Sequence, residues 1–201
     1  MIELFLRGGV AGLAIAVPVG AIAVLIVDRA MRQGFPTGFA AGLGAASADL
    51  LYAGIAVTVG TAVAEVIEPA TTPLRVIAVI ALLAIAARNL RGALRPPEVR
   101  ARPPVRAHHT YLTFLGLTIL NPATMIYFAS LILGLDIAEE SWPAKSMFVL
   151  GAFLGSAGWQ TLLAAGGAFA GVRMGERVRT ITSIVGAAVI AALAVQMATT
   201  I

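Results

Sequence analysis

The stretch QGFPTGFAAGLGAASADLLYAGIAVTVGTAVA, residues 33–64, carries a single charged side chain, Asp49. It exceeds the ~20 residues that a helix needs to cross a ~30 Å hydrocarbon core. Its small residues recur every three or four positions and share one helical face with the carboxylate. The face consists of Gly38, Gly42, Ala45, Asp49, Tyr52, Ala53, Ala56 and Gly60. Small residues allow a neighbouring helix to approach closely, so we expect Gly38 and Gly42 to pack inside a bundle and Asp49 to face inward.

The rest of the chain has the same character. It is 59% hydrophobic and only 12% charged, with a mean hydropathy of +0.93, which excludes an ordinary soluble domain. Five further stretches carry few or no charges: residues 8–27, 76–87, 107–135, 146–172 and 180–201. The stretch 76–87 is short, so Arg75 and Arg88 should reach outward from its ends. The sequence predicts an all-α, polytopic membrane protein of six transmembrane helices.

The first apolar stretch has an alternative interpretation as a cleaved signal peptide. Its amino end carries Glu3 as well as Arg7, so the expected positive region is missing, and five more spans follow. We therefore expect it to remain as a span. The chain has no cysteine, which excludes thiol–disulfide chemistry and thiolate metal sites.

The basic residues are distributed unevenly over the predicted loops. Eleven of the 14 lie after the first, third and fifth spans. Cytoplasmic loops carry such an excess, so we expect a protein of the cytoplasmic (inner) membrane with both termini outside. The net charge of +4 is then a topology signal and does not indicate nucleic-acid binding. Asp28, Arg29 and Arg32 end the first span on the cytoplasmic side. A gate is one interpretation of them, and we expect the other, a solvated helix end.

The chain divides into two halves of three helices. We expect one membrane domain, residues 1–201, with a first repeat at 1–90, a basic, proline-rich cytoplasmic linker at 91–109 and a second repeat at 110–201. Because each half has three spans, the second enters the membrane from the opposite side, which predicts a 3+3 inverted repeat. His108 and His109 are adjacent and have no further ligands nearby, so we expect no metal site and no cofactor.

Two predicted spans are interrupted at corresponding positions, at Pro18 and Gly20 in the first and at Asn121 and Pro122 in the fourth. Proline removes a backbone donor and frees a carbonyl, which lipid cannot satisfy. One such break is commonly a simple kink. Two breaks in corresponding helices favour a binding site near the midplane, lined by the freed backbone groups.

Asp49 is the predicted centre of that site, with Tyr52 one turn away. An ionised carboxylate at the centre of a span costs about 3 kcal/mol, so we expect it to exchange a proton or bind a substrate amine. The alternative is a structural hydrogen bond to a neighbouring helix.

The fifth predicted span has a small-residue face of its own. Its expected packing positions are Gly151 and Gly155, and its expected binding residues are Trp159 and Gln160, an indole and an amide. We predict that the inward face continues through Gly155, Gly158, Trp159, Leu162 and Gly166. Trp159 has the alternative of a packing or interfacial role.

Several motifs together resemble the LysE (lysine exporter)/RhtB-type family of amino-acid translocators. They are PVGAI at 18–22, the glycines between 34 and 44, SADLLY at 47–52, NPATMIYF at 121–128 and GAFLGSAGWQ at 151–160. The resemblance implies six helices, pairing into homodimers, and export of amino acids or similar solutes by proton antiport. One departure is Ala21, where many members have a second proline.

We therefore expect a secondary transporter and not an enzyme, since hydrolysis or proteolysis would need a cluster of reactive groups around Asp49. Its expected partners are a small-molecule substrate, an amino acid above all, and the lipid bilayer. Two alternatives remain, an exporter of a metal or other ion from the same superfamily and a membrane scaffold that does not transport.

Overall fold

The computed structural model describes residues 1–17, 20–59, 62–94, 106–121, 124, 127–128, 137, 140–173 and 176–199. Within these residues it contains seven helices and no strand, which confirms the all-α prediction. The helices are α1 (Ile2–Ala16), α2 (Ala21–Gln33), α3 (Phe35–Val59), α4 (Ala62–Leu94), α5 (Ala107–Ile119), α7 (Trp142–Arg173) and α8 (Glu176–Ala198).

The first predicted span consists of two helices. The axes of α1 and α2 differ by 82°. Pro18 lies outside the described residues, whereas Gly20, whose backbone is extended, directly precedes α2. Gly34, with a φ of 85°, ends α2 and leads directly into α3. A left-handed backbone of this kind favours glycine, so the turn between α2 and α3 is fixed by its sequence.

The third predicted span was estimated too short. Helix α4 has 33 residues, from Ala62 to Leu94, so Arg75 and Arg88 lie within it and do not flank its ends. Charged residues end an apolar run, but they do not end a helix, because the hydrogen bonds of a helix join backbone groups and do not depend on the charge of the side chains. Arg91 belongs to α4, and α5 already begins at Ala107, which places the exposed His108 and His109 in its first turn.

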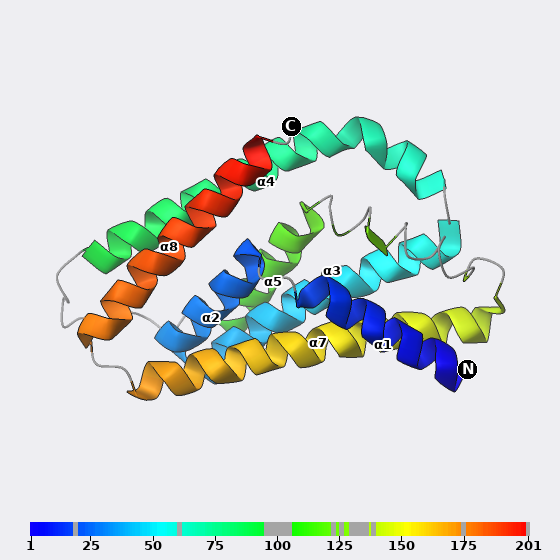
Figure 1. Cartoon of the computed structure of the whole chain (residues 1–201), viewed down its shortest axis with the longest axis horizontal. Coiled ribbons are helices and arrows are strands. Elements are labelled where there is room, and N and C mark those ends of the chain that lie inside the picture. The colour runs from blue at the N-terminus through cyan, green and yellow to red at the C-terminus, as the bar shows by residue number, and fades with distance from the viewer. Residues whose placement is uncertain are drawn as a thin grey trace.

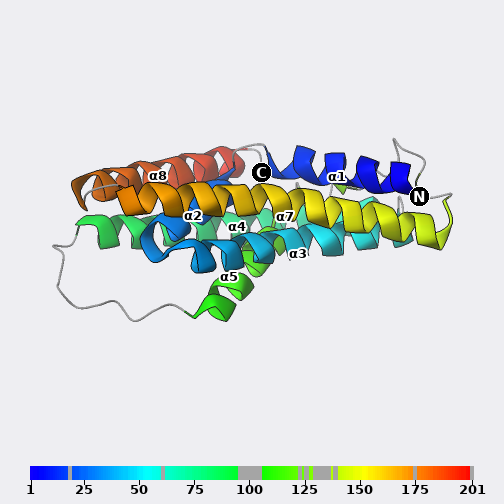
Figure 2. The same cartoon turned by 90° about the horizontal axis from the view of Figure 1, so that it is seen from below.

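Helices from the two predicted halves pack against one another. Figure 1 shows α4 and α8 side by side at one flank of the bundle and α3 and α7 paired along the other. Helix α2 lies between these pairs and contacts α3, α7 and α8. Helix α1 crosses α7, and α5 packs on α3, as the turned view in Figure 2 also shows.

The contact between α1 and α7 is made by backbones. A Cβ on Gly8 or Gly12 would meet the carbonyls of Phe148 or Ala152, and a Cβ on Gly151 or Gly155 would meet the backbone of α1 at Phe5 or Gly9. Glycine on both sides therefore permits this close approach.

The predicted inward face of α3 is confirmed for its described members. Gly38, Gly42, Ala45, Asp49, Tyr52, Ala53 and Ala56 are all buried. Gly60 lies outside the described residues. Gly38 faces Ala30 of α2, and Gly42 faces Gln160 of α7.

By length and apolar composition, α3 and α7 are each able to cross a membrane, and α1 with α2 adds a third crossing if the bent pair counts as one span. This supports a membrane protein. The count of six spans, the inverted repeat and the division into 1–90, 91–109 and 110–201 stay predictions.

Candidate functional site

A polar layer divides the apolar interior of the bundle. On α3, Ala41 and Ala45 belong to one hydrophobic cluster and Tyr52 and Ala53 to another, and Asp49 lies between them. On α7 the same two clusters are separated by buried polar residues, Ser156 and Gln160. Buried polar groups are costly unless they are paired, so a layer of them in an otherwise apolar bundle points to a site.

Asp49 is the centre of this layer. Its side chain is 3% exposed, and its Oδ2 accepts a hydrogen bond of 2.6 Å from the hydroxyl of Ser156 on α7. A carboxylate has about four positions at which it can accept hydrogen bonds. Ser156 fills one of them, so the group keeps acceptor capacity for a proton or a ligand.

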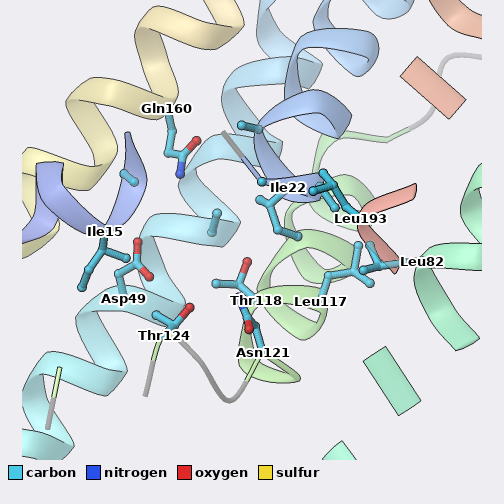
Figure 3. A pocket seen from close by; sticks show the side chains of 15 residues that line it. Ile15, Ile22, Asp49, Leu82, Leu117, Thr118, Asn121, Thr124, Gln160 and Leu193 are labelled. Atoms are coloured by element: carbon cyan, nitrogen blue, oxygen red, sulfur yellow. The ribbon is translucent and has the colours of Figure 1, made fainter. Parts of the chain in front are cut away.

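A cavity of about 210 Å³ opens beside this carboxylate. Figure 3 shows Asp49 and Gln160 on one side of it, with Thr118 and Asn121 at its centre. Its lining comes from the end of α1, the start of α2, and α3, α4, α5, α7 and α8. The polar side chains of the lining are Asp49, Thr118, Asn121, Thr124 and Gln160.

Both predicted breaks border the cavity. Pro18 and Pro122 lie outside the described residues, but their neighbours Gly20 and Asn121 line the cavity wall. Helix α2 begins directly after Gly20, and α5 ends at Ile119, two residues before Asn121. The structure thus brings Asp49, Gly20, Asn121 and Gln160 together around one space.

Tyr52 and Trp159 are not among the lining residues. The hydroxyl of Tyr52 donates a hydrogen bond to the carbonyl oxygen of Ile119, so it ties α3 to the last residue of α5. The indole Nε1 of Trp159 is buried, and no described residue accepts its hydrogen.

The predicted inward face of α7 holds at Gly155, which packs against Gly9 of α1, but was wrong beyond it. A Cβ added to Gly158 or Gly166 would meet nothing within 4 Å, and Leu162 is 65% exposed. The buried stripe includes Phe148, Ala152, Ser156, Gln160 and Ala164. Glycines lie on both sides of this helix, so their spacing does not identify the buried face, which is set by contact with α1 and α3.

Sequence reasoning missed Ser156, Thr118 and Thr124. The sequence could have indicated Ser156, because it precedes Gln160 by four positions and two polar side chains at that spacing share a helical face. The two threonines had no comparable signal, since threonine is common in membrane helices.

The carboxyl end of α2, which the sequence analysis places on the cytoplasmic side, is also more enclosed than predicted. Arg32 Nε contacts Asp28 Oδ1 at 2.8 Å, and their side chains are only 19% and 13% exposed. Asn89 of α4 donates to Asp28 Oδ2 at 3.5 Å. The expectation of a solvated helix end was therefore wrong, and Asp28 instead links α2 to α4.

Comparison with known proteins agrees with this architecture. A family model described as LysE type translocator matches residues 13–200. No significant match was found among curated proteins or among solved structures. The match covers most of the chain, including both breaks and the whole polar layer. The chain therefore belongs to the LysE type translocator family.

Proposed function

We propose that this protein is a secondary transporter that exports amino acids or similar small solutes across the cytoplasmic membrane at the expense of the proton gradient. Family membership makes it a membrane translocator of small solutes. The observation that carries the finer proposal is the buried Asp49 in the wall of a cavity between two apolar clusters. A cavity of about 210 Å³ is smaller than the roughly 300–1,000 Å³ of sites for drug-sized ligands, which suits a small solute.

Asp49 provides a chemical basis for exchange. Burial disfavours an isolated ionised carboxylate, so the group is best accommodated with a proton or with a bound cation. A proton and a substrate ammonium then compete for the same oxygen atoms. If the cavity opens alternately to the two sides, a proton that enters from outside displaces the substrate, and a substrate that enters from the cytoplasm displaces the proton. This competition is sufficient for antiport.

Helix pairing supports an inverted repeat as the framework for this exchange. The second and third helices of the proposed halves, α3 with α7 and α4 with α8, pack as pairs. The first half's α1 packs on α7 of the second half, and α5 of the second half packs on α3 of the first. A twofold relation between 1–90 and 110–201 would produce this reciprocal pattern, and the binding site would lie at the interface between halves.

The proposed orientation places both termini outside, because most arginines fall in the loops predicted for the opposite side of the membrane. Pairing into homodimers is part of the proposal through the family resemblance, and cross-linking in membranes would test it.

The alternative of a metal exporter draws no support from the described residues. Among them, no three His, Cys, Asp or Glu side chains come together as a metal site would need. A scaffold would not require a cavity or a buried carboxylate, both of which cost stability.

Counterflow in proteoliposomes tests the proposed function directly. Vesicles loaded with an unlabelled amino acid should accumulate the radiolabelled form from outside, whereas protein-free vesicles should not. An imposed pH gradient should increase the flux in the direction opposite to proton movement. Absence of counterflow for every amino acid tested, together with flux of a divalent metal ion, would instead establish the metal exporter.

A further inference from the structure

The cavity is polar at one end and apolar at the other. Figure 3 shows Asp49 and Gln160 on one side and Leu82, Leu117 and Leu193 grouped on the other. The leucines come from α4, α5 and α8, and Asp49 and Gln160 from α3 and α7. A ligand that fills this space must present a polar group to one end and an apolar group to the other.

The polar end offers hydrogen-bond acceptors with unused capacity. Gln160 is 5% exposed, and its Oε1 is buried without a hydrogen-bond donor among the described residues. Asp49 on the neighbouring helix keeps acceptor capacity beyond its bond to Ser156. A buried carbonyl oxygen without a donor is costly, so this pair of acceptors favours a ligand with several N–H donors. A primary ammonium has three.

The start of α2 offers donors at the same cavity. Helix α2 has 13 residues, its first residue follows Gly20, and among the residues that the structure describes no side chain caps its amino end. Gly20, Ala21, Ile22 and Ala23 all line the cavity. The backbone N–H groups in the first turn of a helix have no partner within the helix, and the helix dipole adds positive potential. Such an end binds a carboxylate well.

Among the described lining residues, Asp49 is the one with an ionisable side chain. The leucines at the far end provide no acceptor for a second cation and no donor for a second anion. Burial of an unpaired charge against them would be strongly unfavourable.

We infer that the substrate is a neutral amino acid with an aliphatic side chain. Its ammonium binds Asp49 and Gln160, its carboxylate binds the amino end of α2, and its side chain packs against Leu82, Leu117 and Leu193. The inference rests on the proposed function and narrows it, since it excludes basic amino acids such as lysine from this site.

Inhibition of leucine counterflow in proteoliposomes of the unaltered protein tests each of the three proposed contacts, those of the ammonium, the carboxylate and the side chain. Unlabelled leucine should inhibit at a concentration at least about a hundredfold lower than lysine, because lysine places a second charge at the apolar end. Leucinamide, which lacks the carboxylate, and 4-methylpentanoate, which lacks the ammonium, should each be at least about tenfold weaker than leucine.

The outcomes separate the two proposals. Equal inhibition by lysine and leucine overturns the inference, although amino-acid transport still stands. Equal inhibition by leucinamide overturns the role of α2, and equal inhibition by 4-methylpentanoate overturns the ammonium site. If no amino acid shows counterflow, the proposed function itself fails.

A pair of glutamine variants gives a second test. Gln160→Leu removes the free acceptor and should raise the KM for leucine at least about tenfold. Gln196→Leu, which changes an exposed glutamine on α8, is the control and should retain the KM of the unaltered protein. An unchanged KM for Gln160→Leu would contradict the assigned ammonium site.

Discussion

Ser156 and Asp49 form a hydrogen bond of 2.6 Å between α7 and α3, across 107 positions of sequence. It joins the two proposed halves at the depth where the apolar clusters separate. One bond therefore fixes the orientation of the only ionisable side chain among the described residues of the cavity wall. Its two partners can be tested separately.

Replacement of Asp49 by Asn should abolish transport driven by a pH gradient. The amide is nearly isosteric but cannot exchange a proton, and it removes the charge that costs about 3 kcal/mol at the centre of a span, so insertion should be retained. Flux in proteoliposomes should fall to the level of protein-free vesicles. Glu3→Gln is the control, because Glu3 is an exposed carboxylate whose ion pair with Arg7 contributes little. Normal flux from the Asn variant would disprove proton exchange at Asp49.

Ser156→Ala should weaken substrate binding without preventing folding. Loss of a hydrogen bond to a charged group is worth about 1.5–3 kcal/mol, which corresponds to a rise in KM of at least about tenfold. Ser146→Ala on the same helix is the matched control, since that hydroxyl is exposed and its hydrogen bond goes to its own helix, at the carbonyl of Trp142. KM values from counterflow provide the measurement. If both variants show the same KM, the bond to Asp49 has no part in binding.

The inward position of Asp49 could be predicted from the sequence because small residues recur on one face over the whole of 33–64. Glycine has no side chain that competes for the contact, so spacing alone identified the packed side of α3. The two breaks could also be predicted, since proline acts through local covalent geometry, and Gly20 and Asn121 do line one cavity.

The face of α7 could not be predicted in the same way. Gly151 and Gly155 lie against α1, whereas Gly158 and Gly166 face open space. Both sides of the helix have the same composition, and the choice between them depends on a partner distant in sequence. The length of α4 was underestimated for a different reason. The charged residues Glu65, Glu68 and Arg75 interrupt the apolar run, so a hydropathy pattern ends there although the helix continues through them.

Replacement by alanine should change the stability of the protein in opposite directions for the two kinds of glycine on α7. In Gly151→Ala the new Cβ would meet the backbone of Phe5 on α1, and overpacking of this kind typically costs about 1–3 kcal/mol. In Gly158→Ala the new Cβ has open space, and alanine favours the helix by about 0.5–1 kcal/mol. Melting temperatures in detergent should fall for the first variant and remain equal or rise for the second. Equal stability would show that α1 and α7 do not pack this closely.

Tyr52→Phe should perturb the end of α5. The lost hydroxyl leaves the Ile119 carbonyl without that donor, just before Asn121 in the cavity wall, at a cost of about 1–3 kcal/mol. Transport should fall even though Tyr52 does not line the cavity. Tyr127→Phe is the control, because Tyr127 is exposed. Unchanged counterflow and thermal stability for Tyr52→Phe would show that this bond does not position α5.

The proposed orientation can be tested with single cysteines, because the chain contains none and labelling has no background. Glu3 and Ser141 are exposed near the starts of α1 and α7, and His108 is exposed in the first turn of α5. With both termini outside, Glu3→Cys and Ser141→Cys should react with an impermeant maleimide in intact cells, and His108→Cys only after the membrane is opened. The reverse pattern would place the arginine-rich face outside. The direction of export proposed from Asp49 would not change, because in antiport it is set by the proton gradient and not by which face of the protein lies outside.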